Sequence, residues 1–275
     1  MGTTTGVQSN LRYTGIVVNG RKVVNASAGD RRAERARWLY GINAVARRLA
    51  VQPSSIRALH LLGGHSARRA QLAAAAQRAE IPVHETDAAT LRRLTGSESH
   101  QGVAAAADPF HYSELRTVLV RSPGPVLVLD QMQDPHNLGA LIRTAAAVGM
   151  AAVVIPRHGA AGISATVEKV AAGAVNDVPI CQAANTRRCL LDLRRLGYWS
   201  IALTPRAGVS LFDLELPARP VLVLGGEAGL RRLVEATCDL RAAIPLRPGI
   251  ESLNASVAGA IAMYELARRA RGGSF

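Results

Sequence analysis

Apolar runs alternate with amphipathic segments along the second half of the chain. The clearest runs are PVLVLD at 125–130, AAVVIP at 151–156, YWSIALT at 198–204 and PVLVLG at 220–225. Between them, apolar residues recur every three or four positions, which is typical of helices with one buried face. Apolar strands that alternate with helices indicate a parallel sheet covered by helices on both faces. We therefore predict an α/β domain over residues 125–275.

Further elements complete this domain. We expect short strands at 178–180 and 242–246, and helices at 138–148, 164–174, 186–196, 230–237 and 255–270. In the first of these helices, one face is apolar and is predicted to pack on the core: Leu138, Leu141, Ile142 and Ala145. Asn137 is a suitable N-cap for this helix, and Gly149 is a suitable residue just beyond its C-terminus.

The first half of the chain shows the same alternation on a smaller scale. We expect strands at 56–62, 81–86 and 101–108, and helices at 41–50, 66–80 and 87–96, the last capped by Asp87. These elements predict a small α/β domain over residues 37–108. A linker with a short helix follows at 109–124, next to a Pro-Gly-Pro sequence. Residues 1–36 are basic with little apolar periodicity, so we expect a flexible extension.

Composition places the chain among folded globular proteins. Its 275 residues, 48% of them hydrophobic, suffice for the cores of two ordinary domains. No apolar run approaches the roughly 18 residues that span a bilayer, and the N-terminus does not read as a signal peptide, so we expect a cytoplasmic protein. Cys181, Cys189 and Cys238 are odd in number and widely spaced, which indicates inert thiols rather than disulfides or a zinc site.

The net charge of +13, with a pI of about 11.0, favours a polyanionic partner. Residues 1–121 carry 17 Lys and Arg against 8 Asp and Glu, a net +9, while residues 122–275 carry 16 against 12, a net +4. If the partner is a nucleic acid, the first half contributes more of the binding. The alternative is a solvated basic surface from an arginine-rich composition, since Lys22 and Lys169 are the only lysines.

Strand-to-helix turns are the places to look for chemistry, because ligands bind beyond the carboxyl ends of parallel strands. The first such turn is DPHNLGALIRTA at 134–145. Gly139 and Arg143 lie one helical turn apart, on the face opposite the predicted core residues. A ligand could approach the backbone at Gly139 and meet the Arg143 guanidinium. The alternative is an ordinary capped helix with a solvated arginine.

The second turn, VLVLGGEAGLRR at 221–232, places Glu227 among glycines directly after a buried strand. It matches neither G-x-G-x-x-G nor G-x-x-x-x-G-K-[ST], so a dinucleotide site and a P-loop are poorly supported. Glu227 could instead interact with the positive end of the helix at 230–237. This turn therefore has both a chemical and a purely structural interpretation.

The third turn, IPLRPGIESLNASVAGAIAMYE at 244–265, leads through a Pro-Gly loop into the last helix. Ser252 or Asn254 is a suitable N-cap, which is the structural interpretation. The helix also has a face of small side chains, suited to close packing against another helix or a second subunit: Ala255, Ala258, Gly259 and Ala262.

Taken in order, the three turns resemble the three motifs of the SpoU, or TrmH, branch of the SPOUT RNA methyltransferases. The matching patterns are N-L-G-x-x-x-R, strand-G-G-E-x-G-L, and I-P-L followed by S-L-N-x-S, and they cover about residues 125–270. In the first domain, YGINAVARRL and HQGVAAAAD are similar to the L30e-like RNA-binding domain of bacterial 23S rRNA guanosine-2′-O-methyltransferases. Among these, the chain most resembles the enzymes of the peptidyl-transferase-centre loop.

The resemblance implies a SPOUT sheet with a trefoil knot, a homodimer, and S-adenosylmethionine as methyl donor without a metal. It implies 2′-O-methylation of a ribose, with a guanosine of 23S rRNA as the expected target and no binding of DNA. The implied catalytic residues are Asn137, Arg143, Glu227, Ser252 and Asn254. The implied cofactor-binding residues are Thr204, Leu224, Gly225, Gly226, Ile244, Leu246 and Leu253.

Within this resemblance, we expect Arg143 to stabilise the developing 2′-alkoxide and the adjacent phosphate, because a guanidinium stays protonated in proteins. Phosphate or water then accepts the proton. Three alternatives remain: a non-catalytic RNA-binding protein, a nicotinamide-dependent enzyme, and a tRNA methyltransferase of the same branch. The complete motif set argues against the first, the absence of G-x-G-x-x-G against the second, and the L30e-like domain against the third.

Overall fold

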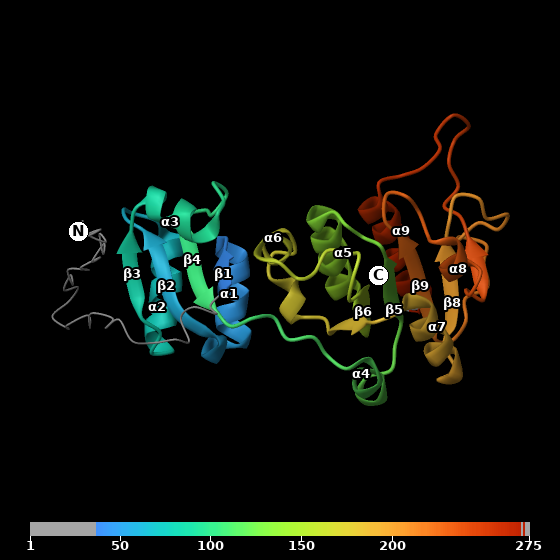
Figure 1. Cartoon of the computed structure of the whole chain (residues 1–275), viewed down its shortest axis with the longest axis horizontal. Coiled ribbons are helices and arrows are strands. Elements are labelled where there is room, and N and C mark those ends of the chain that lie inside the picture. Colours follow the sequence, from blue (N-terminus) through green and yellow to red (C-terminus); the bar gives the residue numbers. More distant parts are fainter. Residues whose placement is uncertain (1–36, 271, 273–275) are drawn as a thin grey trace, which may run out of the picture. The chain divides into compact units, whose positions relative to one another are not determined.

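A computed structural model describes residues 37–270 and residue 272. The predicted basic extension, residues 1–36, lies outside the described residues. The described strands form two sheets, one in each half of the chain (Figure 1). Over the described ranges, no helix is both long enough and apolar enough to cross a membrane.

The first sheet has the strand order β1-β4-β2-β3, and only β2 and β3 are parallel. Its elements are β1 (Arg37–Tyr40), α1 (Ile42–Val51), a 3-10 turn (Pro53–Ser55), β2 (Ile56–Leu62), α2 (Ala67–Arg78), β3 (Val83–Thr86), α3 (Ala88–Thr95) and β4 (Val103–Ala107). Asp87 caps α3 as predicted, accepting a hydrogen bond from Thr90 N at 2.7 Å. The sequence does not predict β1, a four-residue edge strand that is formed by antiparallel pairing with β4.

The second sheet confirms the predicted parallel architecture. Its order is β10-β8-β9-β5-β6-β7, and every neighbouring pair is parallel. The strands are β5 (Val126–Asp130), β6 (Ala152–Pro156), β7 (Ile180–Ala183), β8 (Trp199–Leu203), β9 (Pro220–Gly225) and β10 (Leu240–Ala242). The helices are α4 (Leu115–Arg121), α5 (Pro135–Val148), α6 (Ala165–Val170), α7 (Thr186–Arg195), α8 (Arg232–Glu235) and α9 (Ala255–Ala270), with a 3-10 turn at Ala174–Asn176.

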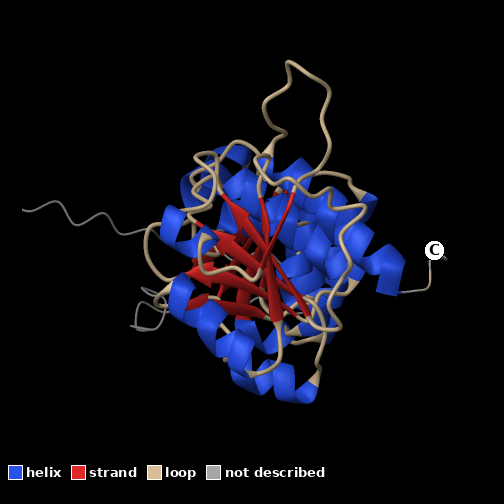
Figure 2. Ribbon diagram, turned by 90° about the vertical axis from the view of Figure 1, so that its right-hand side faces the viewer, coloured by secondary structure: helices blue, strands red, loops and turns tan. Residues whose placement is uncertain are grey.

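Helices cover both faces of the second sheet (Figure 2). On one face, α5, α6 and α9 pack against the strands through side chains such as Leu141, Val167 and Met263. On the other face, α4, α7 and α8 do so through Leu119, Leu190 and Val234. The central strands β5, β6 and β9 are almost completely buried, as the continuous apolar runs predict.

Several predicted boundaries around the second sheet are wrong. Helix α6 ends at Val170 rather than near residue 174, and β7 lies at Ile180–Ala183 rather than at 178–180. Helix α5 begins at Pro135 rather than at residue 138. Helix α8 has only four residues instead of the predicted span 230–237, because the preceding turn continues to Arg231. The last strand lies at Leu240–Ala242, so Ile244 and Leu246 belong to a loop and not to a strand.

Candidate active site

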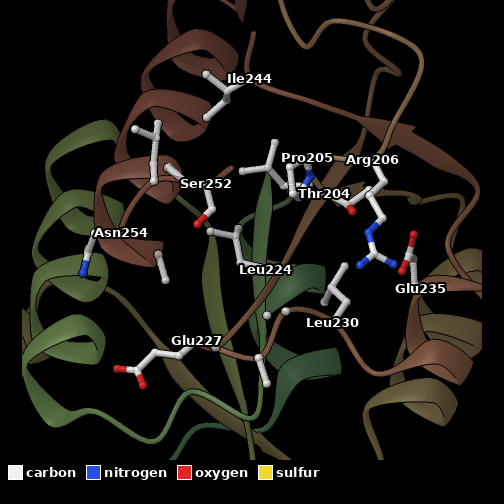
Figure 3. A pocket seen from close by; sticks show the side chains of 18 of the residues that line it. Thr204, Pro205, Arg206, Leu224, Glu227, Leu230, Glu235, Ile244, Ser252 and Asn254 are labelled. Carbon is white, nitrogen blue, oxygen red and sulfur yellow. The ribbon is translucent and has the colours of Figure 1, made fainter. Parts of the chain in front are cut away.

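A cavity of about 560 Å³ lies beyond the carboxyl ends of β8 and β9 (Figure 3). It is lined by residues 203–206, 224–230 and 252–255 together with Glu235, Ile244, Leu246 and Ala258. Ten of the twelve predicted site residues are among them: Thr204, Leu224, Gly225, Gly226, Glu227, Ile244, Leu246, Ser252, Leu253 and Asn254. Segments far apart in the sequence thus meet at the edge of the sheet where ligands usually bind.

The turn between β9 and α8 folds back on itself at two glycines. Gly226 N donates to the Asp130 carbonyl oxygen at 2.9 Å, and Gly229 N donates to the Gly226 carbonyl oxygen at 2.9 Å. A Cβ on Gly225 would overlap the Gly229 backbone, and one on Gly226 would overlap the Gln131 carbonyl oxygen. Backbone packing therefore requires both glycines, and it places peptide groups in the cavity wall.

Glu227 lies at the tip of this turn, exposed on the cavity wall. The structural interpretation of Glu227, as a charge beside the start of the next helix, is wrong. Helix α8 begins at Arg232, and Asp130 accepts the N–H of its N-cap residue Arg231 at 3.2 Å. Glu227 forms no ion pair with any residue that the structure describes, so its carboxylate is available to a ligand.

The loop that enters α9 contributes Ser252 and Asn254 to the cavity. Asn254 Oδ1 accepts hydrogen bonds from Ser256 N at 2.9 Å, Ser256 Oγ at 2.6 Å and Val257 N at 3.3 Å. Asn254, and not Ser252, is therefore the N-cap of α9. Its Nδ2 group has no hydrogen-bond partner in the described part of the chain, so it can donate to a ligand while Oδ1 holds the helix.

The remaining predicted catalytic residues, Asn137 and Arg143, lie on α5 and do not line this cavity. The prediction of Asn137 as N-cap is wrong, because Asp134 accepts from His136 N at 2.9 Å and from Asn137 N at 3.3 Å. Pro135 follows Asp134, and its fixed φ and missing N–H suit the first helical position. Asn137 is instead 6% exposed inside the first turn. Arg143 is exposed and forms no ion pair within residues 37–270.

Gly139 does not face open space. A Cβ there would lie 2.7 Å from Val170 Cβ and 3.0 Å from the Val167 carbonyl oxygen, both in α6. The predicted approach of a ligand to the backbone at Gly139 is therefore wrong, and Gly139 serves close helix packing. Similarly, a Cβ on Gly259 would overlap the Leu141 side chain, so the small face of α9 packs against α5.

The sequence interpretation missed Arg206, Leu230 and Glu235, which also line the cavity. Figure 3 shows the charged groups of Arg206 and Glu235 directed toward each other on the wall opposite Glu227. Glu235 also lies 3.6 Å from Arg241 Nε. The position of Arg206 directly after a predicted strand, at the edge where the motifs gather, could have identified it. Glu235 could not be identified in this way, because it lies inside the helix predicted at 230–237 and not directly after a strand.

The three cysteines lie in surroundings that disfavour the thiolate form. Burial raises the pKa of Cys181 to about 11 and the pKa values of Cys189 and Cys238 to about 12. The thiols therefore stay protonated at neutral pH. Among the residues that the structure describes, no three His, Cys, Asp or Glu side chains form a group that could hold a metal ion.

Comparisons with known proteins agree with this geometry. The family model described as SpoU rRNA Methylase matches residues 124–264, and the one described as RNA 2′-O ribose methyltransferase substrate binding matches residues 38–113. The 23S rRNA (guanosine-2′-O-)-methyltransferase RlmB of Xanthomonas axonopodis is 40% identical over 86% of this chain and 97% of its own length. The corresponding protein of Nitrosomonas europaea is 38% identical over 85% of this chain and 92% of its own length.

Solved structures show the same fold. An rRNA methyltransferase from Sinorhizobium meliloti superposes with a TM-score of 0.69 at 26% identity, over 87% of this chain and 89% of that one. The SpoU methyltransferase AviRb from Streptomyces viridochromogenes, in complex with AdoMet, superposes with a TM-score of 0.73 at 19% identity, over 90% of this chain and 95% of that one. The chain belongs to the SpoU rRNA methylase family.

Proposed function

We propose that this protein transfers a methyl group from S-adenosylmethionine to the ribose 2′-oxygen of a guanosine in 23S rRNA. The observation that carries the proposal is the convergence of ten motif residues on one cavity at the carboxyl edge of the parallel sheet. The relatives that share 38–40% identity with most of the chain are named for this reaction, which supports the choice of substrate.

The cavity has a size and lining that fit this cofactor. Its volume of about 560 Å³ falls within the range of small-molecule sites, roughly 300–1,000 Å³. Leu224, Leu246 and Leu253 supply apolar surface suited to an adenine ring. The carbonyl oxygens of Gly225 and Gly226 supply hydrogen-bond acceptors at positions that no side chain can obstruct.

The charged side chains of the cavity complement the other half of the cofactor. S-adenosylmethionine carries a carboxylate, an ammonium and a sulfonium group, and when bound it supplies a reactive methyl group on the positively charged sulfur. Arg206 matches the carboxylate, and Glu227 and Glu235 match the positive groups.

In the proposed reaction, the 2′-oxygen bonds to the methyl carbon as the carbon–sulfur bond breaks, and water or a phosphate oxygen takes the 2′ proton. Arg143 stabilises the charge that develops on the 2′-oxygen. The Ser252 hydroxyl and Asn254 Nδ2 orient the ribose beside the cofactor. Asn137 lies in the first turn of α5, where it is 6% exposed and where Asp134 caps the helix.

The proposed active form is a homodimer. Val257 and Tyr264 are each 47% exposed on α9 and lie seven residues apart, so they share one face of the helix, which a second copy would cover. Arg143 does not line the cavity of its own chain, and a dimer can bring it to the cavity of the partner. We also propose that the chain in the second half forms the trefoil knot that the resemblance implies.

The first domain, over residues 37–108, is proposed to be an L30e-like module that binds the rRNA. Residues 37–108 carry 9 Arg against 5 Asp and Glu, a net +4, and residues 1–36 add 6 Lys and Arg against 2 Asp and Glu, a further +4. The proposed substrate, 23S rRNA, also favours a cytoplasmic location for the protein. Deletion of residues 1–108 should weaken RNA binding and flatten its salt dependence, while cofactor binding persists.

The test is methyl transfer from labelled S-adenosylmethionine to 23S rRNA fragments and to tRNA, followed by mapping of the modified ribose. We expect one modified guanosine in 23S rRNA. Methylation of tRNA alone would replace this proposal with the tRNA alternative. Cofactor and RNA binding without transfer would indicate a non-catalytic RNA-binding protein.

A further inference from the structure

Asp130 anchors both ends of the turn that forms one wall of the cavity. It is the last residue of β5, is 0% exposed, and does not itself line the cavity. Its carbonyl oxygen accepts the Gly226 N–H at 2.9 Å, where the turn begins. Its carboxylate accepts the Arg231 N–H at 3.2 Å, where the turn ends. One buried residue therefore holds the two ends of the turn in place.

The Asp130 carboxylate also binds two side chains. Arg231 Nε donates to Oδ2 at 3.0 Å and Arg231 Nη2 donates to Oδ1 at 2.5 Å, which makes a bidentate pair. Thr186, at the start of α7 and 2% exposed, donates its hydroxyl to Oδ1 at 3.1 Å and accepts from Arg231 Nη2 at 3.1 Å. The network joins β5, α7 and the turn between β9 and α8.

The turn so anchored is part of the cavity wall along its whole length, since residues 224–230 all line the cavity. Between its anchors it closes on itself through the hydrogen bond from Gly229 N to the Gly226 carbonyl oxygen. A short turn that is closed on itself and fixed at both ends has little freedom to move. The anchors therefore set the positions of the Gly225 and Gly226 peptides and of Glu227.

We propose that Asp130 and Arg231 are positioning residues for the reaction, which hold the wall formed by residues 224–230 in the geometry that binds cofactor. They act through the turn and do not contact the reacting groups. The identity of the ligand, S-adenosylmethionine, rests on the function proposed above, whereas the anchoring of the turn does not depend on it.

Arg231 is partly exposed, whereas its partner Asp130 is buried and depends on Arg231 for a counterion. The Arg231 side chain is 46% exposed, while the Asp130 side chain is 0% exposed. An ordinary surface pair contributes little to stability. Here, removal of the guanidinium leaves a buried carboxylate without its counterion, and such a group recruits water or moves toward solvent. Either response displaces the turn that Asp130 holds.

A second ion pair of the same construction lies outside the cavity and provides a matched control. Asp239, 13% exposed, pairs with Arg194 Nη2 at 2.6 Å, and the Arg194 side chain is 48% exposed. Ser200 donates its hydroxyl to Asp239 at 2.6 Å and its N–H at 2.8 Å. None of these three residues lines the cavity. Arg194→Gln removes a guanidinium that pairs with Asp239 and donates to the Thr237 carbonyl oxygen at 2.8 Å, and neither contact involves the turn of residues 224–231.

The experiment compares the full-length wild type with Arg231→Gln, Arg231→Lys and Arg194→Gln. It measures S-adenosylmethionine affinity by calorimetry, thermal stability, and amide hydrogen exchange of residues 224–231. For Arg231→Gln we expect cofactor affinity about 10- to 100-fold lower, the order of the loss when residues that orient the binding groups of a site are replaced. Exchange in the turn should rise as well. Arg231→Lys should recover only part of the affinity, since an ammonium cannot make the bidentate pair.

Arg194→Gln should retain wild-type affinity even if its thermal stability falls as much as that of Arg231→Gln. The inference is overturned if Arg231→Gln binds cofactor as the wild type does, or if both variants lose affinity in proportion to stability. If the wild type itself binds no S-adenosylmethionine, the proposed function fails. In that case, amide hydrogen exchange still tests whether Asp130 and Arg231 anchor the turn. Equal exchange rates for residues 224–231 in Arg231→Gln and the wild type would refute the anchoring.

Discussion

Gly139 of α5 lies directly against Val170 of α6, so closely that a Cβ on the glycine would come within 2.7 Å of the Val170 Cβ. A Cβ is bonded directly to its Cα, so neither the Val170 Cβ nor a Cβ added at residue 139 could move away without a shift of its helix backbone. The glycine in the first motif therefore has a packing role that is separate from the chemistry of its neighbours. It lets the helix that carries Arg143 lie close to α6.

Gly139→Ala should destabilise the fold. Overpacking of a tight contact costs about 1–3 kcal/mol, only partly offset by the better helix propensity of alanine, by about 1 kcal/mol. We expect a melting temperature lower by a few degrees, measured by calorimetry. Ala147→Ser, on the exposed side of the same helix, is the control and should melt as the wild type does. An unchanged melting temperature with lost methyl transfer would instead restore the ligand-approach interpretation of Gly139.

Arg143→Ala should reduce methyl transfer and leave cofactor binding intact. Removal of one preorganised charge beside a developing oxyanion lowers the rate on the order of 100- to 1000-fold. Arg143→Lys should recover little, because an ammonium cannot span alkoxide and phosphate as the planar guanidinium can. Calorimetric cofactor binding and rRNA methylation on the same preparation provide the measurement. Arg121→Ala, at an exposed position on α4, is the control. Near-normal transfer by Arg143→Ala would make Arg143 an ordinary solvated residue.

Two substitutions of Asn254 should separate its two roles. Asn254→Ala removes the N-cap of α9 and should cost about 1 kcal/mol of stability together with the amide donor. Asn254→Asp keeps a capping oxygen but loses the Nδ2 donor. We expect both variants to lose methyl transfer, while only the alanine variant loses stability in chemical denaturation. Full activity of Asn254→Asp would show that capping is the whole role of this residue.

Stability should depend on the ionisation of Glu265. Hydrogen bonds from Arg268 and Arg269 lower the pKa of Glu265 to about 2, although burial opposes the shift. Because this is below the value of about 4.5 for an unfolded chain, the contribution is fully present above pH 4.5 and is lost as pH falls toward 2. Glu265→Gln should therefore be less stable than the wild type by about 1–3 kcal/mol at pH 7.

Thermal melts of the wild type and Glu265→Gln from pH 4 to pH 8 test this dependence. The difference between them should be constant above about pH 5.5 and should begin to shrink near pH 4.5. Glu98 pairs with Arg92 at 3.0 Å, but the side chains are 75% and 61% exposed, so Glu98→Gln should melt as the wild type does. A difference that grows in acid would contradict the assignment.

Val257→Asp should dissociate the proposed homodimer. A carboxylate on the exposed apolar face of α9 would be buried without a partner in a subunit interface. Sedimentation at micromolar concentration should show a dimer for the wild type and a monomer for the variant. Val120→Asp is matched, since Val120 is 76% exposed on α4, and it should remain dimeric. A monomeric wild type would end the proposal.

The sequence by itself determined the parallel sheet and the positions of most helices, because these depend on local signals. A short continuous apolar run bounded by turn residues is typical of a strand buried on both faces, as the strand of residues 126–130 illustrates. Helix α9 begins and ends at the predicted residues 255 and 270, because its apolar periodicity is regular over its whole length. The edge strand β1 and the short α8 could not be predicted, since pairing and turn geometry define them.

Tertiary structure alone decided what the individual motif residues contact. The cap of α5 is an exception, because Asp134 followed by Pro135 is a local helix-start signal that the sequence interpretation did not use. The sequence cannot show that Gly139 faces α6, because close approach of two helices depends on the packing of the whole layer. Asp130 looks like the polar end of an apolar strand. It becomes the anchor of the cavity wall only when folding brings Arg231, 101 residues away, to its carboxylate.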